Sequence, residues 1–370
     1  MKKERNSSIE LLRLVAMYAI VADHFALYTS AKEYIPSLPV GITKFVFQVF
    51  FLGGGWFGNA LFFIVSVWFL SDRNSTVVDS VRRIWILERE LLFWSISLLG
   101  ISMFMKRTGV MDAGVALSPM KAVFPLATSL WWYPTCYAIF LLFLPVLSSG
   151  LRSIGRRAHA LLAVIVLVIW SNVVPGISFE VTGPSVLLFL GWYVAVTYYK
   201  WYIHDDSRSK AWFFIGVGMS VAIAYWLLAM IAPLLAPSMK TLQLHLDWVY
   251  RTPALFTAFG VFLLANKVTI HSKVINYAAA SSFGIYLIHC YPPMLQWWTH
   301  LNVIDALFGS QYVLLYSLLA ILLIFLICLC LDMIRMLLFR FTCDKAKGHL
   351  FDVIRSKAKE VIDGKEQDEK

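Results

Sequence analysis

Long apolar segments recur along this chain, and they constrain its fold more than any other feature. Crossing about 30 Å of hydrocarbon takes roughly 20 residues of helix. Ten segments of about that length are separated by short polar joints, and they cover residues 9–28, 45–70, 84–105, 126–148, 158–174, 184–200, 211–232, 251–266, 279–298 and 311–339. The pattern predicts an all-α polytopic membrane protein with about ten transmembrane helices.

Composition agrees with this class and excludes others. Only 15% of the residues are charged, whereas about a quarter are charged in an ordinary soluble domain. The net charge is +10, but Lys and Arg cluster at segment ends without a continuous basic face, so we expect no nucleic-acid binding. Residues 1–340 are expected to form one integral membrane domain, and residues 341–370 a short charged cytoplasmic tail.

The basic residues of the loops predict the orientation. The N-terminal segment and the loops after spans two, four, six and eight hold fourteen of them: Lys2, Lys3, Arg5, Arg73, Arg82, Arg83, Arg152, Arg156, Arg157, Lys200, Arg208, Lys210, Lys267 and Lys273. The other five loops hold six: Lys32, Lys44, Lys106, Arg107, Lys121 and Lys240. Since basic loops stay in the cytoplasm, both termini are predicted there. The expected location is a cell membrane crossed several times, most simply a bacterial plasma membrane.

Ionisable residues in the first span mark a candidate site, because such groups are costly inside a bilayer. Arg13 and His24 are eleven residues apart, which puts them within roughly 20° of one helix face and about 16 Å apart along the axis. Glu10 lies within about 60° of Arg13, and Asp23 adjoins His24. Snorkelling to the interface would explain each residue singly. Together they favour a face that lines a hydrated cavity.

Other polar residues within or beside spans leave two interpretations open. Arg82, Arg83 and Arg89 near the start of span three form either local pairs at the interface or a basic funnel for an anionic cytosolic ligand. His289, taken alone, is typical of a satisfied interior histidine. Arg251, at the outer end of span eight, is expected to anchor a headgroup or to meet an acceptor.

No soluble-enzyme motif accompanies these residues. The chain has no GxSxG elbow, Walker A loop, HExxH or GxGxxG element. The five cysteines show no metal-ligand spacing, and we expect buried, inert thiols and no bound metal. The glycines Gly53, Gly54 and Gly55 are expected to allow close helix packing or a kink, and not to bind phosphate.

Four stretches resemble the acyltransferase-3 family of integral membrane acyltransferases, and they occur in the family's order. The Arg-x10-His pair of span one resembles its N-terminal signature. The other three are the Gly58–Ser66 stretch with its Phe-Phe pair, Leu130-Trp131-Trp132-Tyr133 leading to Leu144-Pro145, and the 281–289 element ending in Tyr286-Leu287-Ile288-His289. The chain departs from the family where Val67 replaces a glycine, and where Arg82-Arg83 and then Arg89 replace an Arg-x-x-Arg motif.

The resemblance implies transfer of an acyl group, commonly acetyl from acetyl-CoA, to a hydroxyl of an envelope glycan or lipid-linked glycan such as an exopolysaccharide. His24 is then the expected general base, because a neutral imidazole suits proton abstraction near pH 7. Asp23 would orient the ring. The donor would meet Arg13, Glu10, Arg82, Arg83 and Arg89, and the acceptor Ser66, Trp131, Tyr133, Arg251, Tyr286 and His289.

Rival functions are a transporter or flippase for an envelope glycolipid or small solute, and a non-catalytic membrane partner in glycan assembly. Against transport, the sequence shows no repeated halves and no matched pair of Gly/Pro-broken segments. The acceptor, the length of the acyl group and the oligomeric state are left open by the residues.

Overall fold

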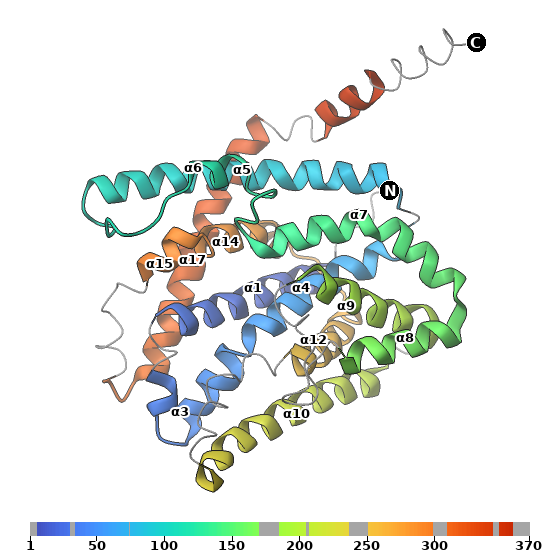
Figure 1. Ribbon diagram of the computed structural model, residues 1–370, viewed down its shortest axis with the longest axis horizontal. Coiled ribbons are helices and arrows are strands. Elements are labelled where there is room, and N and C mark those ends of the chain that lie inside the picture. Colours follow the sequence, from blue (N-terminus) through green and yellow to red (C-terminus); the bar gives the residue numbers. More distant parts are fainter. Residues whose placement is uncertain are drawn as a thin grey trace.

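The computed structural model describes residues 6–29, 34–73, 75–169, 185–204, 207–236, 251–298, 309–342 and 348–357. Within these ranges every regular element is helical (Figure 1), which confirms the predicted all-α class. The turn between α7 (Trp132–Ser153) and α8 (Gly155–Ile169) lies at one end of the view in Figure 1. The short helices α3 (Ile42–Phe45) and α15 (Pro292–Trp298) lie toward the other.

Most predicted segments correspond to a helix or to a continuous helical run. The remaining elements, in chain order, are α1 (Ser7–Tyr28), η1 (Ile35–Ser37), η2 (Val46–Phe51), α4 (Gly54–Leu70), α5 (Val77–Arg107), α6 (Pro119–Val123), α9 (Val186–Tyr198), η4 (Tyr199–Ile203), α10 (Arg208–Leu235), α12 (Arg251–Asn266), α13 (Lys273–Ala279), α14 (Ser282–His289) and α17 (Val313–Phe341). The predicted end of span five, residues 170–174, lies outside the described residues.

Five helical stretches in the described part of the chain are long and apolar enough to cross a membrane: Ser7–Tyr28, Ile42–Leu70, Trp132–Ser153, Arg208–Leu235 and Val313–Phe341. These five stretches are consistent with a polytopic membrane protein. For the other five predicted spans, the expectation rests on the sequence alone. α8 and α12 have only 15 and 16 described residues, and the long helix α5 carries several charged side chains.

The ninth predicted segment is not one helix. Residues 279–298 divide among α13, α14 and α15, with a break before Ser282 and another at Tyr291. Pro292 and Pro293 explain the second break, since proline lacks a backbone donor and disfavours helix at the residue before it. α14 has 8 residues, about 12 Å of helix, so the prediction of a single continuous span here is wrong.

The fourth predicted segment starts later than expected, at Trp132 instead of residue 126. The chain before α7 passes along α5 through the short helix α6. There Ser95 Oγ of α5 donates a 2.5 Å hydrogen bond to the carbonyl of Ala122 in α6. Thr135 Oγ1 ties the start of α7 to the carbonyl of Leu126 at 3.0 Å. This route leaves Trp131 buried in the protein interior, with 2% of its surface exposed.

Helix α1 lies at the centre of the bundle against α4, as Figure 1 shows. Glycines allow the close approach: a Cβ at Gly54 would meet the carbonyl oxygen of Ala19 at 3.0 Å, and one at Gly58 would overlap the carbonyl of Ala16 and the side chain of Ile20. The expectation that the glycines near the start of span two serve helix packing is therefore confirmed.

The loops predicted to be cytoplasmic contact one another. Lys200 on η4 donates to Ser71 Oγ at 3.2 Å, and Arg152 on α7 donates to the carbonyl of the same Ser71 at 2.9 Å. The start of α1 is tied to the loop after α12, because Ser7 N donates to the carbonyl of Ile270 at 2.8 Å. The N-terminus and the loop after span eight therefore share one side, and so do the loops after spans two, four and six.

Candidate active site

Two histidines from distant parts of the sequence meet in the bundle. His24 lies four residues before the end of α1, and His289 is the last residue of α14. The His24 Nδ1 atom lies 3.0 Å from His289 Nε2. The thiol of Cys290 completes the cluster, with its Sγ atom 3.1 Å from His24 Nδ1 and 3.7 Å from His289 Nε2. His289 and Cys290 are buried, and His24 is partly exposed.

Hydrogen bonding determines which nitrogen of each neutral ring carries the proton. His289 Nδ1 lies 2.6 Å from the carbonyl oxygen of Ile285. A carbonyl only accepts, so His289 Nδ1 carries the hydrogen and its Nε2 holds the lone pair. That lone pair accepts the hydrogen on His24 Nδ1. The Nε2 atom of His24 is then left with a free lone pair, which is the form a general base requires.

Aromatic residues predicted to contact the acceptor surround this cluster. A side-chain hydrogen bond joins Tyr286 and Cys290, and the backbone N–H of Tyr133 donates to the Tyr286 hydroxyl. The rings of Tyr133 and Tyr286 lie 6.1 Å apart. The Trp131 ring lies 6.1 Å from that of Tyr291, the residue after Cys290. The structure therefore brings four predicted acceptor residues, Trp131, Tyr133, Tyr286 and His289, to the predicted base.

Asp23 occupies a different part of the helix surface from His24. Its carboxylate is buried against Gly55 on α4, where a Cβ would overlap it. Its charge acts on Tyr28 and on Cys290. The orientation of the His24 ring is accounted for by His289 through Nδ1, so the orienting role expected of Asp23 stays a prediction.

A second polar group lies at the opposite end of α1. Arg13 pairs with Glu10 at 3.3 Å, as their spacing predicts. Both Arg13 and Arg83 act electrostatically on Tyr137 of α7, whose hydroxyl forms a hydrogen bond with Ser66. Ser66 Oγ also donates to the carbonyl of Phe62 at 3.0 Å. Predicted donor residues and Ser66 thus gather around Tyr137.

Arg82, the neighbour of Arg83 on α5, contacts the C-terminal segment. Arg82 forms an ion pair at 3.0 Å with Asp352, in the helical residues 349–357 of the C-terminal segment. The Arg82 guanidinium holds the pKa of the Asp352 carboxyl below its ordinary value. Arg89 is half-buried in α5. Among the predicted donor arginines, the contacts thus group Arg83 with Arg13, and Arg82 with the C-terminal segment.

Arg251 faces the protein interior. Only 3% of its surface is exposed, and its guanidinium lies 4.4 Å from the centre of the Trp56 ring. Of its two predicted roles, anchoring a lipid headgroup does not suit so buried a side chain. Contact with an acceptor inside the protein stays a prediction.

The face of α1 between Arg13 and His24 is apolar and closed. Met17 and Ile20 lie on that face and are 2% and 3% exposed. Ile20 packs where α4 offers Gly58. The described side chains therefore do not form the hydrated cavity that the sequence predicted along this whole face. Two polar groups, one at each end of α1, are separated by an apolar stretch, Met17 and Ile20.

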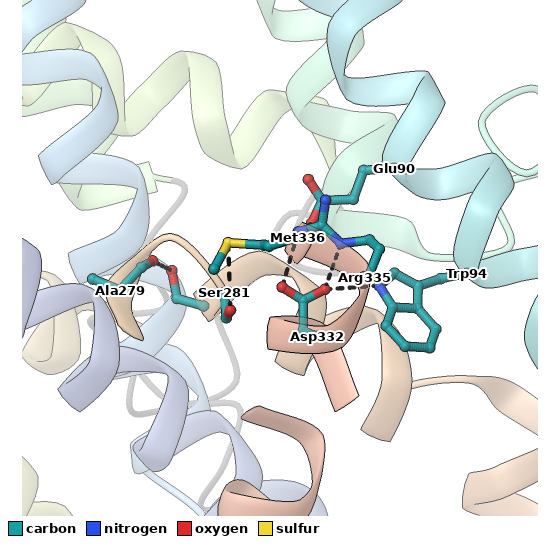
Figure 2. A network of polar contacts seen from close by, with 8 residues as sticks. Glu90, Trp94, Ala279, Ser281, Asp332, Arg335 and Met336 are labelled. Carbon is teal, nitrogen blue, oxygen red and sulfur yellow. Dashed lines mark hydrogen bonds and ion pairs between the residues drawn. The ribbon is translucent and has the colours of Figure 1, made fainter. Parts of the chain in front are cut away.

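A buried charge network holds α14 in place, as Figure 2 shows. Asp332 on α17 accepts hydrogen bonds from Trp94 Nε1 at 2.9 Å and from Arg335 Nε at 2.7 Å. Arg335 also pairs with Glu90 of α5 at 2.9 Å. Gly284 of α14 packs so closely on Asp332 that a Cβ there would overlap the carboxylate. The network therefore joins α5 and α17 directly beneath the helix that ends in His289.

Sequence reasoning missed four residues of these groups: Tyr137, Cys290, Asp332 and Arg335. Asp332 and Arg335 are ionisable residues spaced i, i+3 within a predicted span, the same signal that singled out Arg13. Cys290 directly follows His289, but only the fold brings it to His24. Cys136 and Cys328 are buried as predicted, Cys330 is exposed, and Cys343 lies outside the described residues.

Comparison with known proteins gives one result. A family model described as an acyltransferase domain matches residues 6–333, nearly the whole chain. Neither the curated proteins nor the solved structures contain a match.

Proposed function

Because the chain belongs to the acyltransferase-3 family, we propose that it moves an acyl group, most simply acetyl, from cytosolic acyl-CoA to a hydroxyl of a cell-surface glycan or glycolipid. The observation that carries this proposal is the His24–His289 hydrogen bond. It leaves the lone pair of His24 Nε2 available to a substrate.

The reaction needs one base, and His24 supplies it. As the acceptor oxygen attacks the thioester carbonyl carbon, His24 Nε2 takes the hydroxyl proton. The bond between the carbonyl carbon and the coenzyme A sulfur breaks, and the leaving thiolate takes the proton from the imidazolium. His289 accepts from Nδ1 throughout, which stabilises the charge on the His24 ring.

The donor end of the site lies around Tyr137. Coenzyme A is a polyanion, and guanidinium groups bind phosphates through paired charge-assisted hydrogen bonds. The charges of Arg13 and Arg83 both act on Tyr137, and the Nη1 atom of Arg83 is buried without a hydrogen-bond partner in the described structure. An unpaired buried donor of this kind is costly, so a bound phosphate would stabilise it.

The acceptor end lies around His24. Trp131, Tyr133 and Tyr286 carry apolar ring faces with polar tips, which suit a sugar ring with its hydroxyls. The pantetheine arm of the donor must pass Met17 and Ile20 to reach this end. We expect these two side chains to move when the donor binds.

Acyl transfer in membrane vesicles tests the proposal. Vesicles from cells lacking the native gene would carry wild type, His24→Ala or the exposed control His349→Ala at matched protein level. Radiolabel is followed from acetyl-CoA to extracted glycan. His24→Ala should lower the rate about 10²–10⁴-fold, and His349→Ala should keep it. Near-full transfer by His24→Ala would remove the proposed base.

Transport is the second candidate, and the broken helix favours it. Transporters often place substrate sites at discontinuous helices, and α14 and α15 are separated at Tyr291. Purified protein in detergent has no gradient across it. Acyl transfer under those conditions supports the enzyme, whereas substrate movement in sealed vesicles without acylation supports the transporter.

A further inference from the structure

We propose that His24, His289 and Cys290 form a binding site for zinc, and that zinc bound there switches off acyl transfer. The three residues are grouped within metal-binding distance of one another. The inhibition of acyl transfer by zinc rests on the proposed function. The metal site itself does not.

The spacing of the donor atoms suits one metal ion. The distances are 3.0 Å from His24 Nδ1 to His289 Nε2, 3.1 Å from Cys290 Sγ to His24 Nδ1, and 3.7 Å from Cys290 Sγ to His289 Nε2. Tetrahedral zinc, with Zn–N near 2.0–2.1 Å and Zn–S near 2.3 Å, holds its ligand atoms roughly 3.3–3.7 Å apart. Cys290 Sγ also lies 3.7 Å from His24 Nε2, which places the sulfur beside the face of the ring. Zinc binding therefore needs a side-chain rotation that brings Sγ toward the Nδ1 lone pair, together with a small separation of the two imidazoles.

The donor set selects the class of metal. Two imidazoles and a thiolate suit zinc and other soft or borderline transition ions, whereas magnesium and calcium prefer oxygen ligands. Three protein ligands also leave a fourth position open to water or substrate. His24 is partly exposed, which offers the ion a way in.

The contacts around the three donor residues are typical of those around metal-binding side chains. A metal-binding histidine almost always gives its other ring hydrogen to a carbonyl or carboxylate. His289 does so, since its Nδ1 donates to the Ile285 carbonyl at 2.6 Å and leaves Nε2 free for a metal. The buried carboxylate of Asp23 acts on Cys290 and adds negative charge close to where the cation would lie.

Zinc and the base compete for the same imidazole. Zinc at His24 Nδ1 needs the lone pair on that atom, so the ring hydrogen moves to Nε2. The Nε2 atom then has no lone pair with which to take a proton from a hydroxyl. Binding also breaks the His24–His289 hydrogen bond that supports the base. A zinc-loaded protein is therefore inactive, and removing the metal restores it.

Cobalt titration of the purified, chelator-treated protein tests the site, with Co²⁺ as the spectroscopic probe. Wild type should bind one equivalent and show a sulfur-to-cobalt charge-transfer band. Cys290→Ser should lose that band and bind more than roughly 100-fold more weakly, since even an outer-shell partner is worth 10–100-fold. Cys330→Ser, which changes an exposed thiol, is the matched control and should keep the band.

A wild-type protein without the band, or a band that survives in Cys290→Ser, would overturn the site. X-ray absorption of zinc-loaded wild type needs no variant and covers the case in which Cys290→Ser does not fold. One sulfur and two imidazole nitrogens are expected around zinc, and a spectrum without sulfur contradicts the proposal.

Acyl transfer then tests the inhibition by zinc. Zinc at saturating occupancy should lower the wild-type rate at least tenfold, and a chelator should restore it. An unchanged rate at full occupancy would overturn the inhibition. A metal-free protein without any transfer activity, yet with the cobalt band, would contradict the proposed function and leave the metal site standing.

Discussion

In the proposed reaction, the basic form of His24 depends on a residue 265 positions further along the chain. The carbonyl of Ile285 selects the tautomer of His289, and His289 in turn selects that of His24. This relay of hydrogen bonds makes His289 a positioning residue for the proposed reaction, since it acts through His24.

Replacing His289 separates positioning from folding. His289→Ala removes the acceptor for His24 Nδ1, and kcat should fall about 10–100-fold, the loss typical of an orienting partner. His289→Gln offers a side-chain carbonyl as an acceptor and should recover part of kcat. The check is kcat and KM for both variants at equal thermal stability. Equal kcat losses in Ala and Gln would argue for a packing role only.

Arg82 and Arg83 are neighbours that the structure assigns to different surroundings. Arg82 is paired with Asp352, and Arg83 lies near Tyr137. Arg83→Gln should raise the KM for acyl-CoA about tenfold or more, because a charged hydrogen bond contributes about 1.5–3 kcal/mol. Arg82→Gln should change it less than about threefold, as an exposed pair is worth little. Equal effects in a KM measurement would contradict this division.

At the scale of elements, α14 is too short to be stable by itself and depends on its neighbours. It lies against Asp332, whose charge is compensated by Arg335 and Trp94 (Figure 2). Asp332 is fully buried, and Arg335 is 6% exposed. Arg335 also pairs with Glu90, so it keeps a counter-charge when Asp332 is removed. Removing Arg335 instead leaves the buried carboxylate of Asp332 without its counter-charge.

Arg335→Met should therefore destabilise the protein by about 3–5 kcal/mol, measured as thermal unfolding in detergent. The double variant Asp332→Leu, Arg335→Met also removes the buried carboxylate and should recover most of that loss, since Glu90 is partly exposed. Arg340→Met, at an exposed position of the same helix, is the control and should change stability little. A double variant as unstable as the single would show that the pair itself is stabilising.

The elements differ in how far sequence predicts them. Hydropathy over about 20 residues suffices to predict the helices α1, α4, α7, α10 and α17, since a helix that crosses the bilayer requires that length. It did not reveal the break within 279–298, although Pro292 was a visible signal. The helix spacing of Arg13 and Glu10 gave their ion pair correctly. The meeting of His24 with His289 and Cys290 is a tertiary contact, which no local pattern reports.

For the whole molecule, hydrogen bonds tie together the loops predicted to share the cytoplasmic side. Lys200 and Arg152 meet at Ser71, and Arg82 binds Asp352. These contacts set which loops lie together. The charge bias of the loops then predicts which side they face.

Reporter fusions test that side. A fluorescent protein fused after residue 357 should fluoresce, and a periplasm-dependent phosphatase at the same point should stay inactive, because the C-terminal segment is predicted in the cytoplasm. A phosphatase fused within residues 237–250, in a loop with a single basic residue, should be active. The reverse pattern would invert the topology and place Arg13 and Arg83 outside, away from cytosolic acyl-CoA.

The apolar stretch of Met17 and Ile20 has a bioenergetic consequence. The two polar groups of α1 lie at its opposite ends, and the side chains between them on that face are almost fully buried. Along this face the described side chains between the two groups carry no titratable group that could relay a proton, and each charge that leaks across forfeits about 2.3 kcal/mol per 100 mV of potential. Under the proposed function, a cell could thus modify its surface from a cytosolic donor without discharging its proton-motive force.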